Sequence, residues 1–128
     1  MTFKLHHVAI WVSDLDEAAA FWQREFGAEI GAPYESKRQV GFVSRFARLG
    51  DDGINIELMT KPGLPPAIIE HLGWAHIAIS LGSKTAVDEA SERFAKQGRL
   101  ALGPRTTGDG YYEAIVLGPD DLQIELII

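Results

Sequence analysis

The chain has 128 residues, of which 46% are hydrophobic and 23% are charged, as expected for one ordinary globular domain. Its net charge of −6 argues against a nucleic-acid-binding protein and against electrostatic docking on an anionic membrane, because both need a basic face. The absence of cysteine excludes disulfides, thiolate catalysis and cysteine-bound zinc. The sequence shows neither a signal peptide nor a membrane-spanning apolar run, so we expect a cytoplasmic protein.

The first half of the chain predicts one strand, one helix and three further strands. An alternating strand over 5–12 leads into a helix that Ser13 or Asp14 can cap and that Gly27 ends. Apolar residues at helical spacing form one stripe on this helix: Leu15, Ala18, Trp22 and Phe26. Extended runs follow at about 28–33, 40–49 and 54–60.

The second half repeats this order. A strand over 74–81 precedes a helix that Ser83 caps and Gly98 ends, and extended runs follow at about 99–103, 111–117 and 122–127. The repeat is visible in the residues, since His7-Val8-Ala9-Ile10 recurs as His76-Ile77-Ala78-Ile79 and Ile56-Glu57-Leu58 recurs as Ile124-Glu125-Leu126.

The repeat predicts an α+β fold made of two tandem βαβββ modules. We place the modules at about 1–64 and 72–128, joined by a proline- and glycine-containing connector at about 61–73, within a single domain over 1–128. The two modules together are expected to form a mixed eight-stranded sheet that curls around a cleft, with both helices outside.

Strand alternation brings four residues to the concave face. Side chains of a strand point alternately to its two faces, so if the branched aliphatic residues pack on the helices, the residues between them face the cleft. Four residues that could bind a metal then face inward: His7, Glu57, His76 and Glu125. His6, which has the opposite parity, is expected on the helix side or at an edge.

Two carboxylates in a largely apolar cleft repel one another unless a positive charge neutralises them. No Lys or Arg occupies the inward positions of these four strands. A divalent cation would supply the charge, and imidazole nitrogen with carboxylate oxygen suits Zn, Ni, Fe, Co or Mn. The sequence therefore predicts one divalent metal per site.

These motifs, in this order, resemble the vicinal oxygen chelate superfamily, which includes glyoxalase I, methylmalonyl-CoA epimerase, extradiol dioxygenases, and fosfomycin and bleomycin resistance proteins. The resemblance covers almost the whole chain and implies the paired βαβββ fold, a homodimer, and metal ligands at His7, Glu57, His76 and Glu125. Four ligands are similar to the glyoxalase I pattern, whereas the dioxygenases and fosfomycin resistance enzymes use two His and one Glu. Bleomycin-binding relatives lack the metal set.

The leading functional hypothesis is a metal-dependent lyase, isomerase or epimerase that moves a proton next to a carbonyl of a small-molecule substrate. The metal would stabilise an ene-diolate, Glu125 would take the carbon-bound proton, and Glu57 would return it or remain a ligand. Bacterial glyoxalase I has an Arg that helps to hold glutathione where this chain has Trp11. An indole cannot form a bidentate pair with a carboxylate, which argues against glutathione as the substrate.

Further residues are candidates for substrate binding. The polar, turn-rich stretch 103–112, with Arg105 and Tyr111, could form a substrate loop or a plain solvated loop, and Arg45 could bind an anionic group or make a surface ion pair. Two alternatives for the function remain. One is an Fe(II)-dependent dioxygenase with His7, His76 and Glu125 as ligands. The other is a non-catalytic binding or resistance protein that stacks a flat compound on Trp11, Tyr111 and Tyr112.

Overall fold

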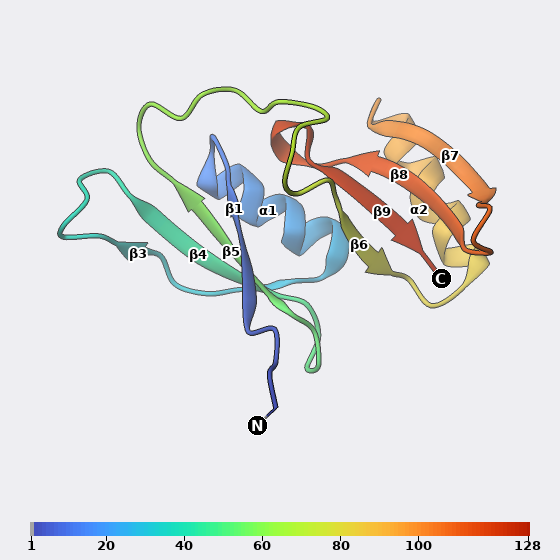
Figure 1. The fold of residues 1–128 in the computed structure, drawn as a ribbon, viewed down its shortest axis with the longest axis horizontal. Helices are drawn as coiled ribbons and strands as arrows, with labels where there is room; N and C mark the ends of the chain where they lie inside the picture. Colours follow the sequence, from blue (N-terminus) through green and yellow to red (C-terminus); the bar gives the residue numbers. More distant parts are fainter. Residues whose placement is uncertain (1) are drawn as a thin grey trace. The chain divides into compact units, whose positions relative to one another are not determined.

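The computed structural model describes residues 2–128, which form two compact units, one up to Pro66 and one over Ala67–Ile128. Each unit contains one α-helix and one mixed β-sheet (Figure 1), and each is described by itself below. Neither α-helix in residues 2–128 has the length and apolar character that crossing a membrane requires.

In the first unit, β1 (His7–Trp11) is followed by α1 (Leu15–Phe26), β2 (Glu29–Ile30), β3 (Tyr34–Glu35), β4 (Val43–Arg48) and β5 (Asn55–Thr60). The sheet has the order β1-β5-β4-β2, and β3 also pairs with β4. β1 runs parallel to β5, while the other pairs are antiparallel. The first and the last strand of the module are therefore neighbours.

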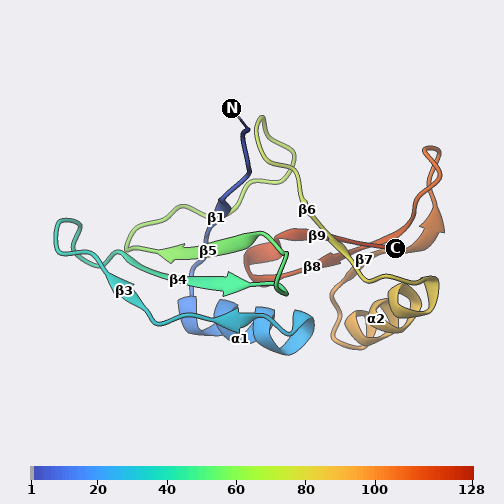
Figure 2. The same cartoon turned by 90° about the horizontal axis from the view of Figure 1, so that it is seen from below.

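The ends of α1 are set by the residues that the sequence predicts. The Asp14 side chain accepts a hydrogen bond from the backbone N–H of Glu17 at 3.0 Å, which satisfies one of the free amides of the first turn. Gly27 ends the helix with a φ of 64°, a left-handed conformation that glycine adopts without a steric cost. The helix covers one face of its sheet (Figure 2), where Trp22, Ile56 and Leu58 are almost fully buried.

The second unit repeats this architecture. β6 (Ile77–Ser80), α2 (Lys84–Lys96), β7 (Leu100–Thr106), β8 (Tyr112–Leu117), a short 3₁₀ turn (Pro119–Asp121) and β9 (Gln123–Ile127) follow one another. The sheet order is β6-β9-β8-β7, again with the first strand parallel to the last. The Ser83 hydroxyl accepts from the Ala86 amide at 3.1 Å and caps α2. The core contains Val87, Phe94, Ile124 and Leu126.

The α+β class and the two βαβββ modules are confirmed, but the single eight-stranded sheet is not. Within residues 2–128, hydrogen bonds join nine strands into one five-stranded and one four-stranded sheet. The run predicted at 28–33 contains only the short strand β2, and the extra strand, β3, lies just beyond its predicted end. β7 also continues to Thr106, beyond the predicted end at 103, so much of the predicted loop 103–112 belongs to a hairpin.

Core burial gives the first testable prediction. Phe94 is fully buried, whereas Phe3 is 86% exposed. We expect Phe94→Ala to lower the free energy of unfolding by about 3–5 kcal/mol, because it removes buried apolar surface and leaves a cavity. Phe3→Ala should leave this free energy almost unchanged. Urea denaturation followed by circular dichroism measures both, and equal losses in the two variants would refute the assigned core.

Candidate functional site

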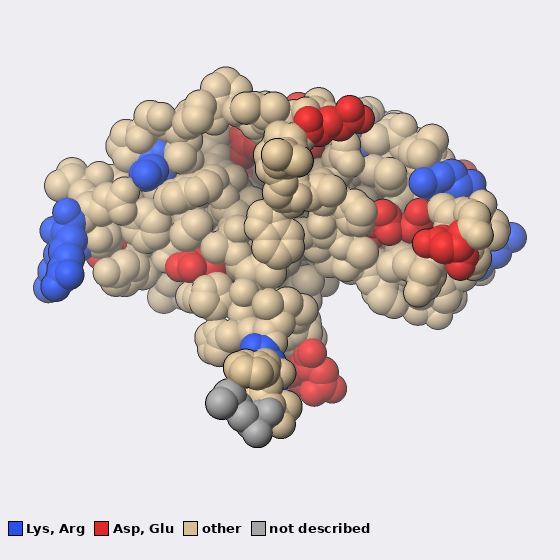
Figure 3. All heavy atoms as spheres, viewed as in Figure 1, with Lys and Arg blue, Asp and Glu red and all other residues tan. Residues whose placement is uncertain are grey.

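Charged side chains on the face shown in Figure 3 lie in small, separate groups among uncharged residues. The Lys and Arg atoms in this view do not merge into a continuous basic surface. Charge on this face is therefore local, and it is set by individual side chains.

In the first unit, His7 and Glu57 lie on the same face of the sheet and face one another. β1 pairs with β5 so that Ala9 is opposite Glu57, and the side chains of β1 alternate in exposure as the sequence predicts. The distance between His7 Nε2 and Glu57 Oε1 is 3.7 Å. The ring of Phe46 on β4 meets the His7 ring edge-on at 5.6 Å between centroids and gives the imidazole an apolar neighbour.

His6 contacts His7 directly, although its parity predicts a place on the helix side or at an edge. Nδ1 of His6 lies 2.8 Å from Nδ1 of His7, and the two rings are almost perpendicular. Such a hydrogen bond fixes the orientation of the His7 ring and leaves Nε2 directed to Glu57. Alternation could not reveal this contact, because His6 precedes the regular strand and its ring turns back toward its neighbour.

In the second unit, His76 and Glu125 form the corresponding pair. His76 directly precedes β6, and Glu125 lies on β9 opposite Ala78. The distance between His76 Nε2 and Glu125 Oε2 is 3.0 Å, and the Glu125 side chain is only 15% exposed. Within either unit, residues 2–128 contain no group of three or more His, Asp or Glu side chains placed to hold a metal ion. Each unit therefore contributes an imidazole–carboxylate pair.

Glu113 on β8 is a second acid beside Glu125, and the sequence analysis missed it. The two side chains are hydrogen-bonded, which raises the pKa of Glu113 above its ordinary value of 4.5. Burial of the carboxyl and the negative charge of Glu125 act in the same direction, while the Arg105 guanidinium opposes them. Alternation along 111–117 could have found Glu113, since Ala114 and Val116 are buried on the opposite face.

Arg105, a predicted substrate ligand, lies on β7 beside Glu113. Its Nη2 is 3.6 Å from Glu113 Oε1, and its Nη1 donates a hydrogen bond of 3.3 Å to the Glu113 carbonyl oxygen. Arg105, Glu113, Glu125 and His76 thus form one connected series of polar contacts across the four strands of the second sheet.

The other predicted substrate residues have different surroundings. Arg45 pairs with Leu58 in the sheet register and points to the α1 side, where its Nε donates to Gly31 O at 2.8 Å and its Nη1 is 3.8 Å from Asp16. Tyr111 is exposed at the β7–β8 turn. Trp11 is 44% exposed and lies on the same face of β1 as His7.

Tyr112 is committed to contacts within the second unit. Its hydroxyl is hydrogen-bonded to the Asp88 carboxylate, which raises the pKa of the phenol, and the Lys84 ammonium lies 5.2 Å from its ring centroid. Residues Lys84 and Asp88 belong to α2, so this tyrosine links β8 to the helix.

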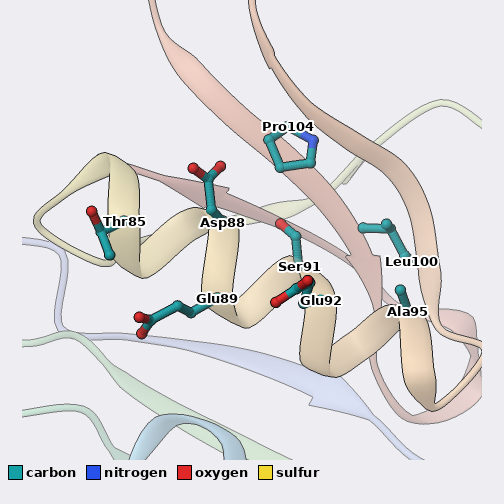
Figure 4. A pocket seen from close by; sticks show the side chains of 8 residues that line it. All are labelled: Thr85, Asp88, Glu89, Ser91, Glu92, Ala95, Leu100 and Pro104. Carbon is teal, nitrogen blue, oxygen red and sulfur yellow. The ribbon is translucent and has the colours of Figure 1, made fainter.

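A cavity of about 470 Å³ opens between α2 and β7. Figure 4 shows Asp88, Glu89 and Glu92 projecting from the helix, with Pro104 from the strand opposite. The lining includes neither His76 nor Glu125, so this cavity is separate from the imidazole–carboxylate pair.

A family model described as "Glyoxalase/Bleomycin resistance protein/Dioxygenase superfamily" matches residues 4–126. The chain belongs to this superfamily. It is 29% identical over 128 residues to the uncharacterized protein YqjT of Bacillus subtilis (strain 168), a match that covers 96% of this chain and 97% of the relative.

Two further similarities are to named proteins. The chain is 33% identical over 73 residues to an ethylmalonyl-CoA/methylmalonyl-CoA epimerase of Cereibacter sphaeroides, covering 57% of this chain and 45% of the relative. The fold matches that of the fosfomycin resistance protein FosX of Listeria monocytogenes, crystallised with Mn(II) and sulfate, with a TM-score of 0.72 and 24% identity. This match covers 99% of the chain and 93% of FosX.

The acid pair in the second unit predicts a pH-dependent stability. Because the pKa of Glu113 is raised in the folded state, the folded protein holds this proton more tightly than the unfolded chain does. The resulting stabilisation is complete below the ordinary pKa of 4.5 and is lost as the pH rises through the folded-state pKa. We expect metal-free Glu113→Gln to match the wild type near pH 4 and to melt a few degrees higher at pH 7.

Thermal melts in a chelating buffer across this pH range measure the difference. Glu92→Gln, which removes an exposed carboxylate from α2, is the matched control and should show no such pH-dependent gain. A Glu113→Gln melting temperature that stays parallel to that of the wild type at every pH would contradict the assigned Glu113–Glu125 contact.

Proposed function

We propose that the protein is a metal-dependent enzyme of the lyase or isomerase type that moves a proton next to a carbonyl in a small-molecule substrate. The observation that carries this proposal is the duplicated imidazole–carboxylate pair. His7 with Glu57, and His76 with Glu125, occupy matching positions of two units that have the same strand order. If one such pair served only the stability of its own unit, the other unit would not need the same pair.

The residues of the two pairs fit a divalent metal by their chemistry. Two imidazole nitrogens and two carboxylate oxygens are a donor set that Zn, Ni, Fe, Co and Mn accept. The Glu57 and Glu125 side chains are 21% and 15% exposed, so water screens their charges only partly. A catalytic metal site needs at least three protein ligands, and we propose that His7, Glu57, His76 and Glu125 are the residues that supply them.

The metal, when bound, would act as a Lewis acid for negative charge that develops on substrate oxygens. The chain's own residues would move the proton. Glu125 is the proposed base, since its hydrogen bond to Glu113 and its contact with His76 hold the carboxylate in a defined orientation. Glu57 would return the proton or serve only as a ligand. The similarity to an epimerase supports this class of reaction.

A second candidate is a binding protein that takes up a flat apolar compound without turnover. It is favoured by the exposed Trp11 ring, which meets Phe42 edge-on at 5.9 Å between centroids. Tight binding in the absence of metal, without product formation, would favour this candidate. Oxygen consumption with a catechol and Fe(II) would instead indicate a dioxygenase.

We also propose that the protein acts as a homodimer. Large apolar side chains are highly exposed in the segment before β6, where Leu72, Trp74 and Ile68 are 101%, 78% and 72% exposed. Exposed apolar surface of this extent is typical of protein–protein contacts. Light scattering coupled to size exclusion would show a dimer, whereas a monomer at micromolar concentration would exclude this arrangement.

Ligand substitutions test the metal site. We expect His7→Ala and Glu125→Ala to lower the affinity for a divalent metal by more than the roughly 10–100-fold that loss of a supporting residue costs. His71→Ala, which removes an exposed histidine of the connector, should keep the wild-type metal content. Elemental analysis of the purified proteins measures their metal content. Unchanged metal content in all three variants would rule out the proposed ligands.

A separate variant tests the base. Glu125→Gln keeps an oxygen donor but cannot accept the proton, so once a substrate is in hand we expect kcat to fall by about 10²–10⁴-fold while metal is retained. Full activity of Glu125→Gln would assign the proton transfer to another group.

A further inference from the structure

Three side chains of the first unit form a cluster at the far end of the face that carries His7. The Lys61 ammonium lies 4.9 Å from the Trp11 ring centroid, and the Phe42 ring meets Trp11 edge-on at 5.9 Å and 89°. We name Trp11, Phe42 and Lys61 the Trp11 cluster. Trp11 is 44% exposed, and the other two side chains are partly buried, so the cluster is open to a ligand.

Backbone contacts hold the cluster in place. The Val12 amide donates to Met59 O at 2.8 Å, which extends the β1–β5 pairing beyond Trp11. Gly41, next to Phe42, has a φ of +84°, and a Cβ added there would lie only 2.6 Å from Pro62 Cδ. The residues on either side of this contact, Phe42 and Lys61, are therefore kept close to one another. A side chain at Gly41 would disturb the contact.

Lys61 carries a positive charge that no described acidic side chain pairs with. Among residues 2–128, Lys61 forms no ion pair, and the contact described for it is with the indole of Trp11. An aromatic face holds an ammonium group weakly and leaves its N–H donors free for an anion. A carboxylate is a suitable anion because a charge-assisted hydrogen bond to it is short and strong.

The position of the cluster relates it to the His7–Glu57 pair. His7 and Trp11 share a face of β1 and are four residues apart, which corresponds to roughly 13 Å along a strand. On this face Ala9 lies between His7 and Trp11 on β1, while Glu57 is opposite Ala9 and Met59 is opposite Trp11 on β5. An elongated organic acid can therefore reach both ends.

We propose that the Trp11 cluster binds an aromatic carboxylate, with the carboxylate on Lys61 and the ring against Trp11 and Phe42. The inference rests on the proposed function, because it assigns this cluster to the end of the substrate that does not react. The substrate class is then an organic acid with a planar apolar part, whose reactive carbonyl lies toward His7 and Glu57.

Binding of phenylacetate to the metal-free protein tests the inference. We expect phenylacetate to shift the Trp11 indole N–H signal in an NMR titration, with saturation in the millimolar range. Its neutral isostere phenylacetamide should bind roughly tenfold more weakly or worse. Lys61→Met should lose affinity for phenylacetate by roughly tenfold or more, whereas Lys61→Arg should keep most of it, since both lysine and arginine donate to a carboxylate.

Lys84→Met is the matched control, because Lys84 also lies over an aromatic ring, Tyr112, but in the other unit. It should bind phenylacetate like the wild type. Equal affinity of Lys61→Met and wild type, equal affinity for phenylacetamide, or no saturable shift of the Trp11 signal overturns the inference. The experiment contains no metal, so its failure is distinguishable from failure of the proposed function, which the metal content of the His7 and Glu125 variants decides.

Discussion

The parallel pairing of the first and last strand in each module is the constraint on which the candidate site depends. β1 lies against β5 and β6 against β9, so an imidazole near the start of a module is brought beside a carboxylate near its end. The connection between these strands runs through the helix and the other strands of the module. The helix covers one face of the sheet, and burial of Ile56, Leu58, Ile124 and Leu126 against it fixes the register. A shift by one residue would turn Glu57 or Glu125 toward the helix.

That register places charge where water screens it only partly. In the second unit, Glu113 and Glu125 are hydrogen-bonded on one face, and burial together with mutual repulsion disfavours two negative charges. The Arg105 guanidinium offsets the negative charge of Glu113. Above the raised pKa of Glu113, this contact between two carboxylates therefore disfavours the folded state.

The sequence predicted the features that depend on periodicity and on capping. The order of elements, the caps at Asp14 and Ser83, and the alternation in β1 and β9 all follow from local patterns that tertiary contacts reinforce. Features that depend on register or on a single side-chain contact were not predictable in this way. Arg45 lies within the predicted run 40–49, but its face depends on the pairing with Leu58, which turns it to the helix side.

The repeat did not predict Glu113, because the matching position of the first unit carries no acid. Its counterpart in the first unit is Ser44, because Ser44 pairs with Met59 as Glu113 pairs with Ile127. Serine is not an acid, so comparing the two repeats does not reveal Glu113. The hydrogen bond between His6 and His7 was missed because the His6 ring departs from strand alternation. Both contacts lie beside a proposed ligand, where a local rule is most easily overridden.

The two units differ in the residues that surround the repeated imidazole–carboxylate pair. The repeated positions carry the same imidazole and carboxylate, whereas their surroundings have diverged. Around His7 the neighbours are aromatic, with Phe46 at the imidazole and Phe42 and Lys61 at Trp11. Around Glu125 the neighbours are ionisable, since Glu113 contacts Glu125 and Arg105 contacts Glu113. Aromatic surface with one cation is suited to hold a carbon skeleton in place, and coupled acids are suited to hold and release a proton. Under the proposed function, a duplicated module that keeps its imidazole and carboxylate and changes their neighbours in this way can assign recognition to one half of the chain and proton transfer to the other.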